Sequence, residues 1–188
     1  RPLFLINALN TGLIETRGLN NYGIALDLNN LNSASSILNK GIINVKGDKS
    51  GGIVLKGSIG NTDDNVVNKG NINVTSSTSF GIYSNVSDTK YVNEGNIDLT
   101  SAANSIGLRN EGGLLKNGSN GIINLTNGTN NIGLYSTDGT TENNGKIIIS
   151  NGTDNIGIYA KGSGTSVVNS GEINAVSSGK IKGIAVTD

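Results

Sequence analysis

The stretch Asn39-Lys40-Gly41-Ile42-Ile43-Asn44-Val45 decides the fold of this chain, because its pattern Asn-x-Gly-x-Ile-x-(Val/Leu) recurs along the sequence. Clear copies follow at residues 68–74, 93–99, 143–149 and, ending in alanine, 169–175. Two copies are degenerate: residues 10–16 lose the last apolar position, and residues 119–125 carry Ser119 in place of the asparagine. Self-similarity of this kind is typical of folds built from stacked, equivalent units.

A second glycine motif, mostly an apolar residue followed by Gly and then Ile or Leu, accompanies each copy of the first. Its glycines are Gly23, Gly52, Gly81, Gly107, Gly133, Gly157 and Gly183. The first glycine precedes the second by 11 residues in three units and by 12 in four, whereas the return to the next unit takes 12 to 18 residues. A solenoid explains why one spacing is nearly constant and the other varies. Stacked units keep the length of the segments that form the core and confine length variation to loops.

Within each motif the apolar residues alternate with polar ones, which is the period of a β-strand and not of a helix. Apolar pairs such as Ile43/Val45 and Ile72/Val74 are expected to face inward, and a third apolar pair, as at Ile37/Leu38, precedes the asparagine. Three strands per turn predict an all-β, right-handed parallel β-helix (β-solenoid) of about seven turns, roughly 34 Å long. The handedness follows from the general preference of parallel connections. The repeated asparagines predict a ladder of stacked amides at one turn.

The domain prediction is a single β-solenoid segment over residues 1–188. Its repeats begin near Gly12, Gly41, Gly70, Gly95, Gly121, Gly145 and Gly171. Neither end shows a polar cap or an amphipathic helix, although terminal repeats normally shield their edge strands in this way. We therefore expect an internal fragment of a longer solenoid.

Composition excludes several classes of site. The chain has 31 Asn and 28 Gly among 188 residues, and it has no His and no Cys. Ser-His-Asp and Cys-His arrangements and the usual zinc ligand sets therefore cannot form. Formal net charge is zero and no basic run occurs, so no nucleic-acid partner is indicated. We expect no metal and no other cofactor.

The acidic residues occupy no shared repeat position, which argues against an enzyme. Six of the 14 lie in expected loops, at Asp63, Asp64, Asp88, Glu111, Asp138 and Asp154. Asp63 and Asp64 leave a calcium site open, but the nonapeptide of calcium-filled β-rolls is absent. Six Asn-x-Ser/Thr triplets, at Asn73, Asn85, Asn117, Asn124, Asn127 and Asn151, are sugar-acceptor sequences that this composition also explains by chance.

One expected outward row carries most of the tyrosines. Two positions past the second glycine lie Ala25, Val54, Tyr83, Arg109, Tyr135, Tyr159 and Ala185. Tyrosines beside an arginine favour stacking and cation–π contact, either with one another or with a sugar or protein ligand. The candidate ligand-binding residues are therefore Tyr83, Arg109, Tyr135 and Tyr159. The alternative is that these side chains only pack on one another along the sheet and bind no ligand. A second outward row, polar in character, contains Asn44, Asn73, Asp98, Asn124 and Asn174.

The phrases Tyr91-Val92-Asn93-Glu94-Gly95-Asn96-Ile97 and Gly157-Ile158-Tyr159 resemble the passenger regions of large type V, fusobacterial-type autotransporter adhesins. The resemblance spans nearly the whole chain. It implies secretion, display at the bacterial cell surface through a C-terminal outer-membrane β-barrel, and a role in virulence. The implied partner is a protein or glycan on host cells or on other bacteria, and the implied function is adhesion or spacing as a rigid stalk.

Two other functions stay open. A carbohydrate-active β-helix, which binds or degrades polysaccharides, requires clustered carboxylates and basic residues on one face if it is to be an enzyme. A more remote alternative is an ice-binding solenoid, which requires a regular threonine row. Thr75, Thr100 and Thr126 start such a row, but Lys46 and Ser150 interrupt it.

Overall fold

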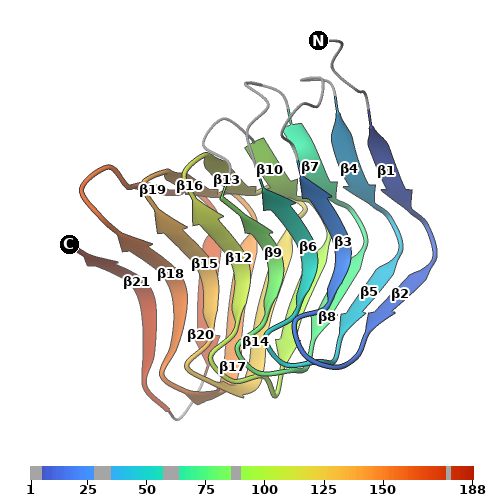
Figure 1. Cartoon of the computed structure of the whole chain (residues 1–188). Coiled ribbons are helices and arrows are strands. Elements are labelled where there is room, and N and C mark those ends of the chain that lie inside the picture. The colour runs from blue at the N-terminus through green and yellow to red at the C-terminus, as the bar shows by residue number, and fades with distance from the viewer. Residues whose placement is uncertain (1–5, 28–34, 57–63, 86–89, 177–178) are drawn as a thin grey trace.

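The computed structural model describes residues 6–27, 35–56, 64–85, 90–176 and 179–188. These residues form 21 strands and no helix, and the strands belong to three parallel sheets of seven strands each. Each coil of the chain adds one strand to every sheet, so the coils stack as a three-sided β-solenoid (Figure 1). The predicted β-solenoid with three strands per turn is confirmed.

The three sheets are named by their order within a coil. The first sheet contains β1 (Asn7–Asn10), β4 (Ser36–Asn39), β7 (Asp64–Asn68), β10 (Lys90–Asn93), β13 (Leu114–Asn117), β16 (Thr140–Asn143) and β19 (Ser166–Asn169). The second contains β2 (Leu13–Thr16), β5 (Ile42–Val45), β8 (Asn71–Val74), β11 (Asn96–Thr100), β14 (Ile122–Thr129), β17 (Lys146–Thr153) and β20 (Glu172–Val176). The third contains β3 (Tyr22–Asp27), β6 (Gly51–Lys56), β9 (Phe80–Ser84), β12 (Ile106–Glu111), β15 (Ile132–Thr137), β18 (Asn155–Lys161) and β21 (Ile181–Thr187).

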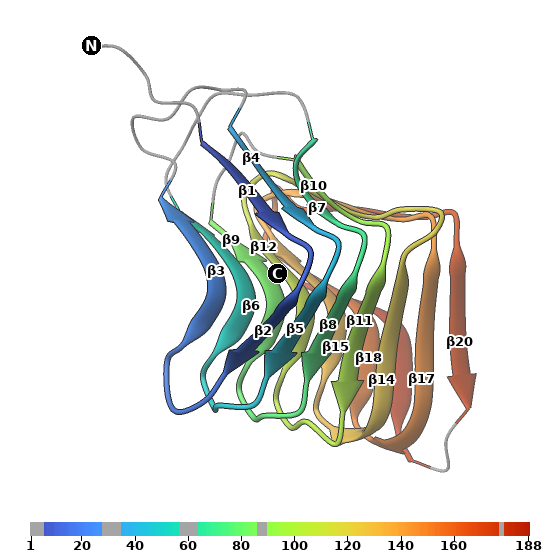
Figure 2. The same ribbon diagram turned by 90° about the vertical axis from the view of Figure 1, so that its right-hand side faces the viewer.

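The coil is right-handed. Seen from the N-terminal end in Figure 2, the chain runs clockwise through β1, β2 and β3 while successive coils recede from the viewer. This is the sense in which nearly all parallel crossover connections wind, because right-twisted strands pack back onto their sheet most readily that way.

The core consists of aliphatic side chains stacked from coil to coil. In β8, Ile72 and Val74 are fully buried, while Asn71 and Asn73 between them face outward and are half-buried. Full burial of such an aliphatic side chain stabilises the fold by about 1.5–3 kcal/mol. Equivalent isoleucines of successive coils lie in direct register at Ile14, Ile43, Ile72, Ile97, Ile123, Ile147 and Ile173.

The glycine of the second motif is required where neighbouring coils approach closely. A Cβ atom on Gly52 would lie 2.6 Å from the carbonyl oxygen of Gly81 and 2.7 Å from Cγ2 of Ile72 in the core. Gly52 and the following Ile53 are both buried, so the strict alternation of the strand is interrupted at this point. The strands of the third sheet accordingly bow toward the interior, and the outer surface of this sheet is concave (Figure 2).

A ladder of asparagine side chains lines the first corner, between the first and second sheets. Each amide nitrogen donates to the amide oxygen of the next coil at 2.7–2.9 Å. Its members are Asn10, Asn39, Asn68, Asn93, Asn117, Asn143 and Asn169. The amide ladder is therefore confirmed, with one correction. Asn117, and not Ser119, holds the position in the fifth coil, because two extra residues before Gly121 loop outward there.

A second polar ladder, not predicted from the sequence, lines the corner between the second and third sheets. The backbone N–H of each coil donates to a side-chain oxygen of the next coil at 2.9–3.1 Å. The accepting residues are Ser50, Ser79, Ser105, Asn131 and Asn155. At this sharp corner these backbone N–H groups do not bond to a backbone carbonyl of the sheet, and the side-chain oxygens accept their hydrogen bonds instead.

Candidate functional site

The predicted tyrosine row exists on the outer face of the third sheet. Strand pairing places Tyr83 against Arg109, Arg109 against Tyr135, and Tyr135 against Tyr159. The row continues at both ends through Val54 and Ala25 and through Ala185. Parallel in-register stacking thus brings together four side chains that lie 24 to 26 residues apart in the sequence.

The side chains of this row contact one another directly. The guanidinium carbon of Arg109 lies 5.2 Å from the ring centroid of Tyr83 and 5.7 Å from that of Tyr135. The rings of Tyr135 and Tyr159 are stacked, with centroids 5.6 Å apart and an interplanar angle of 19°. Cation–π and stacked aromatic pairs each contribute about 0.5–1.5 kcal/mol. The row is therefore one continuous stack across four coils.

Glu111 neutralises the only charge in this stack. Its carboxylate forms an ion pair with the Arg109 guanidinium and accepts a hydrogen bond of 2.8 Å from the Tyr83 hydroxyl. Burial, together with the nearby Glu111 carboxylate, raises the pKa of Tyr83 to about 12. The Arg109 Nε is buried without a hydrogen-bond partner, which is a consequence of its position between two rings.

The aromatic surface extends beyond the predicted row to Phe80 and Tyr22. Phe80 lies 5.4 Å from Tyr83 and 6.1 Å from Tyr22, measured between ring centroids. Its ring occupies the space above Gly51, where any Cβ atom would collide with it. Both residues immediately precede a second-motif glycine, at the position of Ile132 and Ile156, which the alternation predicts to face inward; the structure places this position on the outer face, because the glycine and the residue after it are both buried. We call the six residues Tyr22, Phe80, Tyr83, Arg109, Tyr135 and Tyr159 the aromatic face.

No family model, no curated protein and no solved structure matches this chain. Among the described residues, no helix is long and apolar enough to cross a membrane. Functional assignment therefore rests on the surface chemistry of the solenoid itself.

Tyr91 is the one described tyrosine that does not belong to the aromatic face. It is fully buried in the core, and its hydroxyl donates to the backbone oxygen of Arg109 at 3.2 Å. Burial raises the pKa of Tyr91 well above its ordinary value. Its hydroxyl supports the backbone beneath Arg109 and is not available to a ligand.

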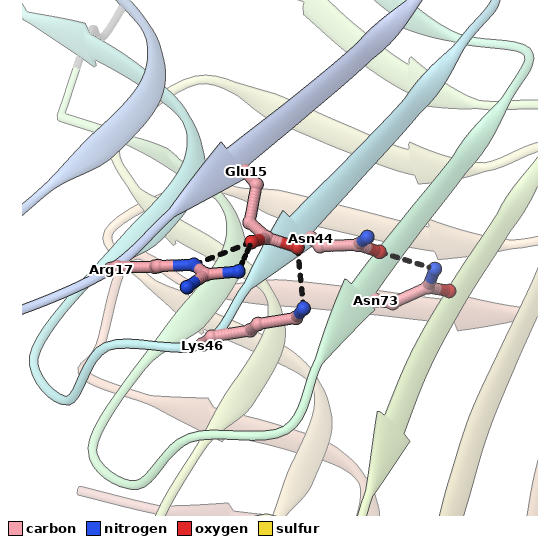
Figure 3. A network of polar contacts seen from close by, with 5 residues as sticks. All are labelled: Glu15, Arg17, Asn44, Lys46 and Asn73. Carbon is pink, nitrogen blue, oxygen red and sulfur yellow. Dashed lines mark hydrogen bonds and ion pairs between the residues drawn. The ribbon is translucent and has the colours of Figure 1, made fainter.

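The outer face of the second sheet is polar and is called the polar face. Figure 3 shows its N-terminal part, where Glu15 forms ion pairs with Arg17 and Lys46 and Asn73 donates to Asn44 at 2.8 Å. The hydrogen bonds from Lys46 and Arg17 lower the pKa of Glu15. A shallow depression of about 390 Å³ lies on this face, lined by Asn44, Lys46, Asn73, Thr75, Asp98 and Thr100. Within the predicted polar row, Asn73 bonds to Asn44 and Asn124 bonds to Asp98, whereas Ile148 separates Asn174 from the other members.

The acidic residues singled out from the sequence lie apart. Asp63 and Asp88 fall outside the described residues, and Asp64 begins β7. Asp138 and Asp154 are exposed at corners with positive φ, whereas Glu111 contacts Tyr83 and Arg109 of the aromatic face. Within the described part of the chain, no three acidic side chains lie close enough together to hold a metal ion.

The six Asn-x-Ser/Thr triplets differ in exposure. Asn117 is fully buried in the amide ladder, and Asn73 and Asn124 are half-buried with their amides donated to neighbouring coils. The exposed ones are Asn85, Asn127 and Asn151. The fold therefore leaves half of these triplets open to modification in the folded state.

Proposed function

We propose that this chain is a segment of a surface-displayed bacterial adhesin, in which a rigid solenoid presents the aromatic face to host cells or to other bacteria. The resemblance to autotransporter passengers supports display at the cell surface. A solenoid also suits the role of a spacer, because each coil contacts only its neighbours and the rod lengthens by adding coils.

The observation that carries the proposal is the segregation of aromatic residues. Of the six aromatic residues in the described part of the chain, Tyr91 is buried, and the other five lie on the outer face of the third sheet. Tyr, Phe and Arg are enriched at the centres of protein recognition surfaces. A rod that served only as a spacer has no need to gather these residues on one of three sides.

An adhesion assay tests this proposal. Beads coated with the protein are incubated with epithelial cells and with a panel of bacteria, and bound beads are counted. We expect adhesion by the native protein and a loss of about tenfold or more for Tyr83→Ala/Tyr135→Ala/Tyr159→Ala. The matched control, Asn73→Ala/Thr75→Ala/Thr100→Ala on the polar face, retains adhesion.

The triple tyrosine variant also loses stacking energy, so a second variant separates adhesion from folding. Thr137→Glu adds a charge two residues after Tyr135 on β15 without removing any ring, and we expect it to reduce adhesion while the melting temperature stays unchanged. Adhesion that is equal for the native protein and both variants would overturn the assignment of the adhesive surface. Absence of adhesion by the native protein to every target would overturn the proposed function.

A further inference from the structure

The outer surface of the third sheet, which carries the aromatic face, has the same arrangement of side chains across its width in four successive coils. An apolar row, Phe80, Ile106, Ile132 and Ile156, precedes the second-motif glycines. The stack of Tyr83, Arg109, Tyr135 and Tyr159 runs alongside it. On the other side of the stack lies a polar rim, formed by Glu111, Thr137 and Lys161 in three of these coils and continued by Thr187 in the next coil. Across its width the surface therefore changes from apolar to polar, and along the solenoid axis this arrangement repeats from coil to coil.

Two of the three tyrosine hydroxyls of the stack bond to the polar rim. Tyr83 donates to Glu111 at 2.8 Å, and the hydroxyls of Tyr159 and Thr187 are hydrogen-bonded at 2.8 Å. In the described structure the Tyr135 hydroxyl has no such partner, although it lies in the centre of the strip. It is therefore free to donate to, or accept from, a ligand.

Charge favours an uncharged ligand. Arg109 is the only charged residue of the stack in these four coils, and its ion pair with Glu111 neutralises it. The apolar row carries no charge in the same coils. The rim adds Lys161, which is exposed and forms no ion pair among the described residues, but a single solvent-screened charge gives a strongly anionic partner little Coulomb energy.

The architecture does not favour an extended peptide that adds as a strand. β9, β12, β15 and β18 each pair with a strand on both sides, so their backbone groups are already used within the sheet. Peptide recognition by strand addition requires an open sheet edge. A ligand on this face must instead bind through side chains.

From this combination we propose that the aromatic face binds a neutral, linear glycan lying along the solenoid axis in the concavity of the third sheet (Figure 2). This inference rests on the proposed adhesive function and names its ligand class. Sugar C–H groups pack on the isoleucine row and on the outward edges of the stacked rings, while hydroxyl groups bond to the rim and to Tyr135. The coil spacing of about 4.8 Å is close to the length of one residue in an extended polysaccharide, so a glycan along the axis presents about one sugar to each coil.

The four-coil strip spans roughly 14 Å, which sets the expected ligand length. Binding is measured by titration calorimetry and saturation-transfer NMR with uncharged oligosaccharides of glucose, galactose and N-acetylglucosamine. For at least one of these series we expect affinity to rise from the disaccharide to the tetrasaccharide and then to level off. Affinity stays constant between about 0.05 M and about 0.5 M salt, because no ion pair to the ligand is made.

Two substitutions localise the site. Tyr135→Phe keeps the ring stack and removes only the free hydroxyl, and we expect an affinity loss of several-fold. Ile132→Lys places a charge in the apolar row, and we expect a loss of about tenfold or more. Asn73→Ala on the polar face serves as the matched control and leaves affinity unchanged, and circular dichroism verifies the fold of each variant.

The outcomes separate this inference from the proposed function. Adhesion that persists after periodate oxidation of the target surface, with no binding of any neutral oligosaccharide, overturns the glycan assignment and leaves the adhesin proposal standing. Binding of galacturonic acid oligomers alone, with strong salt dependence, overturns the choice of an uncharged ligand. Glycan binding that Ile132→Lys leaves intact overturns the location.

Discussion

The amide of Asn93 donates to the amide oxygen of Asn117 at 2.9 Å, across a coil in which the first corner is two residues longer than in its neighbours. Asn117 continues the ladder, because its amide donates to the amide oxygen of Asn143 at 2.8 Å. The same amide donates to the backbone oxygen of Gly121 at 3.2 Å. The ladder is therefore continuous through this coil, because the two extra residues lie in an outward loop and not in the core.

We expect Asn117→Ala to destabilise the fold by about 1–3 kcal/mol, because it leaves the buried amides of Asn93 and Asn143 each short of a partner. Ser119 is exposed, so Ser119→Ala is expected to change stability by less than about 0.5 kcal/mol. Urea denaturation of both variants measures the difference. Equal stabilities would contradict the assignment of Asn117 to the ladder.

We expect Gly52→Ala to destabilise the protein by several kcal/mol or to prevent folding, because its Cβ would lie 2.6 Å from the Gly81 carbonyl oxygen. The matched control is Gly183→Ala at the equivalent position of the last coil, where no atom lies within 4 Å of the added Cβ. Thermal melts followed by circular dichroism compare the two. A similar loss in both variants would show that the close approach between coils is not the reason for this glycine.

Stability is expected to fall as the pH rises above about 10. The pKa of Tyr83 is raised from 10.0 to about 12, and that of buried Tyr91 is raised as well, so the unfolded chain loses these protons at lower pH than the folded one. The stability that these groups contribute is complete below pH 10 and declines through the window up to about 12. Urea midpoints measured from pH 8 to pH 12 check the slope.

Tyr83→Phe isolates one of the two groups. We expect the variant to show a shallower decline above pH 10, and the ultraviolet titration of the native protein to show a phenolic group near 12 that the variant lacks. If the two titration curves coincide, the perturbed group is not Tyr83.

Arg109 and Tyr135 are expected to be energetically coupled. A double-mutant cycle with Arg109→Ala and Tyr135→Ala should give a coupling free energy of about 0.5–1 kcal/mol, the usual strength of an exposed cation–π contact. The control cycle pairs Arg109→Ala with Tyr159→Ala, which lies two coils away, and should give a value near zero. Coupling of equal size in both cycles would indicate a general loosening of the sheet and not a contact.

Much of this architecture can be read from the chain because each coil repeats the same pattern and stacks in register on the next. The two glycine motifs set the coil length, and the period of two in Ile72 and Val74 assigns each side chain to the core or the surface. The row of Tyr83, Arg109, Tyr135 and Tyr159 follows directly, since parallel coils in register place equivalent positions one above another.

The sequence by itself determined the coil, its three strands and the register of the tyrosine row, because these follow from patterns that repeat within each unit. Only the tertiary structure decided that Asn117 replaces Ser119 in the ladder, that Ser79 accepts the backbone N–H of Ser50, and that Phe80 covers Gly51. Each of these depends on which atoms of adjacent coils meet, across 24 to 29 residues of chain, and on how far a corner can loop outward. The sequence repeats a Ser or Asn two residues before the second-motif glycine, but packing between coils decides which atoms these side chains bond.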